Sequence, residues 1–195
     1  MPANVKGYRM KYIVEEVDKK AGMAGIKNLE EEYGNLDFKA TEIYSEDDNI
    51  RLLIAATKVI FKNTNGSSLF EMGRILAQKL ISTKMTKIGI SMVSKTNIFK
   101  NTFFNPTILR TIEKTIPFFA PSLKVQLENP DKNTIKIKFL DTKVPRKLYE
   151  GEWFELFSQL IKEKVSSDSK QITSNSYEIM IYCENFQKLN EELLN

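Results

Sequence analysis

The sequence predicts an α+β fold in which N-terminal helices pack on a small antiparallel sheet. Apolar residues recur at helical spacing over the first two-thirds of the chain, and after Pro121 the apolar period changes to two. A further helical segment then separates a predicted hairpin from a last strand. With 195 residues, 42% of them hydrophobic, we expect a single domain over 1–195 that includes a C-terminal helical tail over 186–195.

The first helix is predicted from Tyr8 onward, where aromatic and aliphatic residues follow helical spacing, and Gly22 is expected to stop it. A short helix is predicted over 27–33, between two glycines. The next helix is expected to begin after Ser45, which is a favourable N-cap residue followed by three acidic residues in the first turn. Its apolar stripe extends to Phe61.

Another helix is predicted after the break at 63–66. Ser68 and Glu71 are spaced as a capping box. Gly73 and Ala77 are small and four residues apart, so a second helix is expected to approach closely there. The segment 85–100 fits a helix or a strand equally, and a helix is predicted from Asn105-Pro106 to Pro117.

The strands follow. Alternating apolar residues over 123–127 and 135–139 flank the turn-forming segment 129–133, which predicts an antiparallel hairpin with one wet face. Pro145 precedes a helix whose stripe includes Phe154 and Phe157. The polar segment 165–175 fits a strand and a turn, and 177–183 is predicted as a strand.

Four segments carry a resemblance to a known superfamily. They are Val5-Lys6-Gly7-Tyr8 with the helix that follows, Phe70-Glu71-Met72-Gly73-Arg74, the segment from Leu148 to Phe157 with its glycine, and the strand from Ser176 to Glu184. Over about Val5 to Glu184 the chain resembles the superfamily of haem nitric-oxide/oxygen-binding (H-NOX) domains, 4-vinyl reductase domains and TRAPP-type vesicle-tethering subunits.

The functional residues of that superfamily do not carry over. The haem-binding branch uses an axial histidine and a Tyr-x-Ser-x-Arg signature, and this chain has neither. Many 4-vinyl reductase domains carry cysteines suited to a metal, whereas here Tyr149 stands near the first such place and Cys183 is the lone cysteine. The resemblance therefore implies a haem-free relative, for which we expect no cofactor and no metal site.

Composition points away from the common catalytic systems. The chain has no histidine, so histidine general bases and Ser-His-Asp or Cys-His nucleophile systems are excluded. We assign no catalytic residue and do not expect an enzyme, although an unrecognised type stays open. The acidic runs 30–32 and 46–48 lack the ligand spacing of a calcium loop.

Two aromatic features are candidates for function. Phenylalanines crowd the predicted core, and they are interpreted either as the lining of a pocket for an apolar ligand or as ordinary core packing. The candidate ligand-binding residues are Phe103, Phe104, Phe118, Phe119 and Phe157. Trp153, the single tryptophan, lies at the edge of a helical stripe, which fits a dimer or partner interface or a partly buried packing residue.

The expected function is a non-enzymatic sensory or small hydrophobic ligand-binding domain. The alternative is a dimeric scaffold or protein-interaction module without a ligand, which would use Trp153 or the tail helix. Nucleic-acid binding through the basic segment 84–114 is less favoured, because the net charge is only +4. We recognise no secretory signal and no run of about 20 apolar residues, so a cytoplasmic protein without a membrane span is expected.

Overall fold

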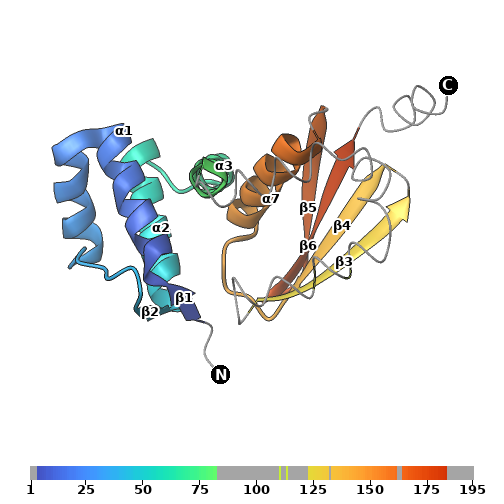
Figure 1. Cartoon of the computed structure of the whole chain (residues 1–195), viewed down its shortest axis with the longest axis horizontal. Helices are drawn as coiled ribbons and strands as arrows, with labels where there is room; N and C mark the ends of the chain where they lie inside the picture. Colours follow the sequence, from blue (N-terminus) through green and yellow to red (C-terminus); the bar gives the residue numbers. More distant parts are fainter. Residues whose placement is uncertain are drawn as a thin grey trace.

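The computed structural model describes residues 4–82, 110, 113, 123–131, 133–161 and 164–183. Helices α1 and α2 lie at one side, α3 lies between them and α7, and α7 lies along a four-stranded sheet at the other side (Figure 1). The architecture is α+β with antiparallel sheets, as predicted. The sequence predictions for 85–100 and for the tail 186–195 fall outside the described residues, as does the helix predicted over 105–116 apart from residues 110 and 113.

Helix α1 (Gly7–Tyr33) has a kink where the sequence predicts a stop. Gly22 has a φ of 62° and a ψ of −163°, which interrupts the helical backbone. The chain then returns to helix as far as Tyr33, and Gly34 follows with a φ of 108°. The two predicted helices are therefore arms of one kinked element.

Two short strands that the sequence analysis did not predict precede and follow this region. Strand β1 (Asn4–Lys6) pairs antiparallel with β2 (Ile43–Ser45), with Val5 opposite Tyr44. Three residues are too few to display an alternating pattern. The pairing brings the start of α1 beside the start of α2.

Helix α2 (Glu46–Phe61) begins as predicted. The Oγ atom of Ser45 accepts a hydrogen bond from the backbone N–H of Asp48 at 3.0 Å. One of the free N–H groups of the first turn is thereby satisfied.

Removing this cap is expected to lower stability modestly. Ser45→Ala should reduce the free energy of unfolding by about 1 kcal/mol, because the side chain that accepts from the first turn is lost. Chemical denaturation measures the change. Ser67→Ala, at an exposed serine in the first turn of the next helix, is the control and should change stability by less than about 0.5 kcal/mol. Equal effects of the two variants would contradict the assigned cap.

The predicted capping box of the next helix is wrong. Helix α3 spans Gly66–Ser82, so Ser68 lies within its first turn. The side chain of Asn65 accepts from the N–H of Ser68 at 2.9 Å, and the Ser68 hydroxyl donates to the side chain of Asn63. The side chains of Asn63 and Asn65, which precede the helix, thus cap it one turn before Ser68, the residue predicted to be the cap.

Helices α3 and α7 (Arg146–Ile161) pack with their backbones in contact. A Cβ at Gly73 would overlap the carbonyl oxygen of Leu148 and stand 2.9 Å from the backbone nitrogen of Glu152. A Cβ at Gly151 would overlap the carbonyl oxygen of Phe70. The close approach predicted at Gly73 is confirmed, and its counterpart is the glycine of α7.

The main sheet has the strand order β3-β4-β6-β5 and is antiparallel throughout. The predicted hairpin consists of β3 (Lys124–Asp131) and β4 (Thr134–Leu140). The last two strands are β5 (Val165–Thr173) and β6 (Ser176–Cys183). The sheet's apolar face is buried and packs with α7.

Buried apolar side chains form two clusters. One lies among α1, α2 and α3, and the other lies between the sheet and α7. Among the described residues, Tyr149 is the side chain that packs against both. In the part of the chain that is described, no helix combines the length and the apolar character that crossing a bilayer requires.

Candidate ligand-binding pocket

A pocket of about 280 Å³ lies where the two clusters meet. Its wall combines β1 and α1 with the start of α2, the second half of α3, and α7. Most of its lining residues are aliphatic or aromatic. The described lining residues are Val5, Lys6, Tyr8, Arg9, Tyr12, Glu46, Asn49, Leu76, Ala77, Leu80, Ile81, Leu123, Val144, Tyr149, Glu152, Trp153 and Leu156.

An ion pair between Arg9 and Glu152 crosses the wall from α1 to α7. Burial disfavours the charge on Arg9, but the nearby Glu152 outweighs it and raises the pKa of the guanidinium. Arg9 therefore stays charged, and its charge is compensated within the wall.

The phenol of Tyr149 is neutral in this setting. Burial raises its pKa, and the carboxylates of Glu152 and Glu46 act in the same direction against the opposing charge of Arg9. Its ring stacks on Phe139, with 4.9 Å between ring centroids. Tyr149 thus presents an uncharged aromatic surface.

Glu46 and Asn49 contribute the polar groups of α2. Burial and the neighbouring Asp47 raise the pKa of Glu46, against the charge of Lys143 and a hydrogen bond from Thr142. The side chain of Asn49 is only 2% exposed, and its Oδ1 atom has no hydrogen-bond partner among the described residues.

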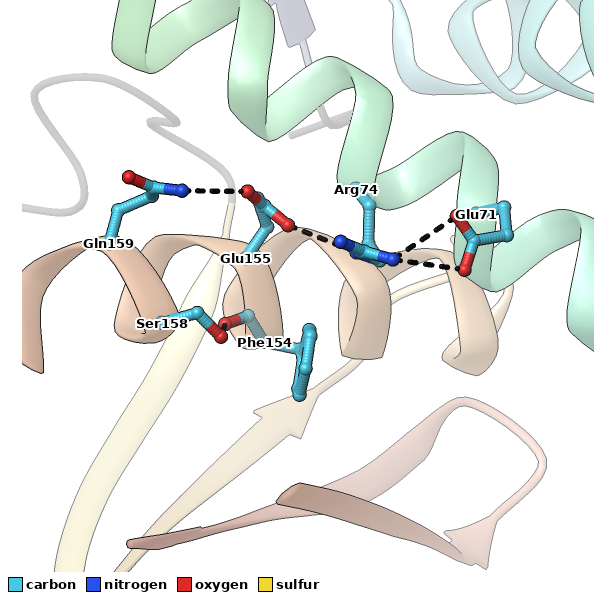
Figure 2. Close-up of polar contacts among 6 residues, drawn as sticks. All are labelled: Glu71, Arg74, Phe154, Glu155, Ser158 and Gln159. Atoms are coloured by element: carbon cyan, nitrogen blue, oxygen red, sulfur yellow. Dashed lines mark hydrogen bonds and ion pairs between the residues drawn. The ribbon is translucent and has the colours of Figure 1, made fainter. Parts of the chain in front are cut away.

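A network of polar side chains joins α3 to α7 beside the pocket (Figure 2). Arg74 of α3 donates to Glu155 of α7 through Nε at 3.0 Å and to Glu71 through Nη1 at 3.2 Å. Gln159 also donates to Glu155 at 3.1 Å, and the Arg74 guanidinium lies 5.5 Å from the centroid of the Phe154 ring. Burial alone would raise the pKa of Glu155. The hydrogen bonds from Gln78, Arg74 and Gln159 outweigh the effect of burial and lower that pKa.

The structure places two of the sequence-predicted site residues. Trp153 lines the pocket and stacks on Phe157, with 5.8 Å between ring centroids. Phe157 is 2% exposed in the core of the sheet and lies behind that wall. The other candidates, Phe103, Phe104, Phe118 and Phe119, fall outside the described residues.

The sequence analysis missed the polar part of the wall. Asn49 stands on the buried face of α2 together with Leu52, Leu53 and Ala56, and a polar residue on an apolar stripe was a detectable signal. Arg9 and Glu152 gave no such signal, because nothing in the sequence brings two residues so far apart together. Among the described residues, no group of three or more acidic or cysteine side chains is placed to hold a metal ion.

Comparison with known proteins identifies the architecture. No protein-family model matches the chain, and no curated protein matches it in sequence. Solved structures match in three dimensions. An Fe(II) unliganded H-NOX protein from K. algicida is 10% identical, with a TM-score of 0.65 over 93% of this chain and 97% of that chain. An H-NOX protein from Shewanella woodyi in the Fe(II)CO ligation state is 14% identical, with a TM-score of 0.63 over 93% and 95%.

The chain has an H-NOX-like fold. The resemblance stated from the sequence is thus confirmed at the level of architecture. The match extends over 93% of this chain, so it includes most of the helices and strands described above.

The donors of this H-NOX-like chain do not fit a haem held in the manner of most haem proteins. The sequence contains no histidine. Its single cysteine, Cys183, is 3% exposed in the core of the sheet, and the described pocket wall does not include it.

Proposed function

We propose that this chain is a haem-free, non-enzymatic domain of H-NOX-like fold that binds a small, mainly apolar molecule and acts as a sensory or ligand-carrying module. The observation that carries the proposal is the pocket of about 280 Å³, whose wall is mainly aliphatic and aromatic. Its size is just below the roughly 300–1,000 Å³ typical of small-molecule sites. The phenylalanines 103, 104, 118 and 119 are proposed as further contacts, with Phe157 supporting Trp153 from behind.

The test is binding of the neutral dye aminoanthracene, whose fluorescence rises in an apolar site. The wild-type protein is expected to bind it with one site per chain. Ala77→Leu places a larger side chain in the pocket wall, so affinity should fall at least about tenfold. Ala24→Leu, at an exposed position of α1 outside the described wall, is the matched control and should bind normally.

Native mass spectrometry of the freshly purified protein complements this test. A small molecule released on denaturation would identify the class of ligand directly. If the wild-type protein carries no molecule and does not bind the dye, the ligand-binding proposal fails. A dimer under those conditions would favour the scaffold alternative, with Trp153 as its predicted interface.

A further inference from the structure

Asn49 lines the pocket and carries a buried Oδ1 atom. The residue is 2% exposed and lies in the first turns of α2. Among the described residues, no donor reaches this oxygen. A buried amide oxygen has two lone pairs, and leaving both without a donor is unfavourable.

Several other buried polar side chains of the described chain have partners, whereas the Oδ1 atom of Asn133, at the turn between β3 and β4, also lacks one among the described residues. The hydroxyl of Thr57 donates to the carbonyl of Leu53 at 2.7 Å. Glu150 accepts from Ser167 at 3.1 Å, and Glu155 accepts from Arg74 at 3.0 Å. Asn49 differs from these residues in that it also faces a cavity. A molecule bound in the pocket is therefore in a position to donate a hydrogen bond to Oδ1 of Asn49.

The charges of the described wall balance. Lys6 and Arg9 are opposed by Glu46 and Glu152, and Arg9 is already paired with Glu152. The described part of the wall therefore has no net formal charge with which to attract an ion. A charged ligand would also lose its hydration on entering an apolar site, which is costly without a partner.

The rest of the wall favours a ring-bearing molecule. Tyr8 and Tyr12 lie with their ring centroids 5.7 Å apart on α1. Tyr149 and Trp153 contribute two more rings from α7. Aromatic side chains bury a large apolar area and pack against flat molecules with defined geometry.

We propose that the pocket selects an uncharged, mainly apolar ring compound that carries one O–H or N–H donor, and that this donor bonds to Oδ1 of Asn49. The inference rests on the proposed ligand-binding function and specifies the chemistry of its ligand. Asn49 is the specificity-determining residue, and the aromatic side chains provide most of the contact area.

The test compares para-butylphenol with para-butylanisole, which replaces the hydroxyl by a methyl ether and cannot donate. Calorimetric titration of the full chain is expected to give about tenfold tighter binding of the phenol, because only the phenol satisfies the buried oxygen. Asn49→Leu has a side chain of similar size and no acceptor, so the two compounds should then bind within about twofold of each other. Asn49→Ala is the second variant if the leucine does not fold, and it should also lose the preference.

The outcomes separate this inference from the proposed function. Equal affinity of the wild-type protein for both compounds would overturn the role of Asn49 while leaving the pocket intact. A preference for the ether, or a preference for the phenol that persists in Asn49→Leu, would overturn it as well. If neither compound nor aminoanthracene binds to the wild-type protein, the proposed function fails and this inference fails with it.

Discussion

Replacing Gly73 with alanine is expected to lower the free energy of unfolding by about 3 kcal/mol, the upper end of the range for overpacked interiors. The new Cβ would overlap the carbonyl oxygen of Leu148 in α7. Backbone atoms cannot move aside by a change of rotamer, so α3 and α7 must separate. Gly151→Ala should have a similar effect, since its Cβ would overlap the carbonyl of Phe70. Urea denaturation followed by circular dichroism measures both changes.

Gly66→Ala is the matched control for these variants, because it is the same substitution in the same helix. The nearest atom to its Cβ would be a side-chain carbon of Lys147 at 3.5 Å, which is an ordinary contact. We expect no loss of stability there. The double variant of Gly73 and Gly151 should cost less than the sum of the two single variants, because one separation of the helices relieves both clashes. A loss below about 0.5 kcal/mol for Gly73→Ala would contradict the packing described.

Replacing Arg74 with methionine is expected to cost about 3 kcal/mol at neutral pH. The carboxylate of Glu155 is buried, and Arg74 is its cationic partner at 3.0 Å. Removing Arg74 leaves this buried carboxylate without its cationic partner, with only the amides of Gln78 and Gln159 as donors among the described residues. The length of methionine keeps much of the contact with Phe154, so the change isolates the charge.

The pH dependence of this variant distinguishes lost charge pairing from lost packing. In the wild-type protein the pKa of Glu155 is lowered from its ordinary value of 4.5. Its contribution to stability is thus present above that value and is lost as the pH falls through the lower pKa of the folded state. In Arg74→Met the hydrogen bond and the charge of Arg74 are lost, so the pKa of Glu155 is higher than in the wild-type protein. The destabilisation relative to wild type should therefore shrink as the pH falls.

Denaturation midpoints at several pH values between about 3 and 7 test this expectation. Arg51→Met is the control, because Arg51 is exposed and lies 3.6 Å from the partly exposed Asp48. Exposed pairs contribute little, so that variant should lose less than about 1 kcal/mol. A destabilisation by Arg74→Met that stays constant with pH would show that packing, rather than charge pairing, explains the loss.

Local chemistry made parts of the fold predictable. The cap at Ser45 follows from a hydroxyl placed before acidic residues, and the hairpin follows from an apolar period of two on either side of a turn. Gly22 and Gly73 were correctly singled out, because a positive φ and a backbone contact both require the absence of a Cβ. These features depend on a few neighbouring residues or on one residue type.

Other features depend on where a helix begins or on long-range contact. Ser68 had the right spacing for a capping box, yet the helix begins earlier, and the side chain of Asn65 accepts from the N–H of Ser68 itself. The pair β1–β2 is too short to form an apolar pattern. Arg9 and Glu152 are 143 residues apart, so their pairing becomes visible only when α1 and α7 have been placed together.

Tyr149 has a consequence for how the molecule loses its structure on heating. It is the one described side chain that packs in both apolar clusters, and it also lines the pocket. The clusters are also joined where α3 and α7 pack with their backbones in contact, so we expect both to melt in one transition, with a van't Hoff enthalpy equal to the calorimetric enthalpy. A molecule in the pocket touches both clusters and binds only when both are folded. We therefore expect a bound molecule to raise the midpoint of that single transition.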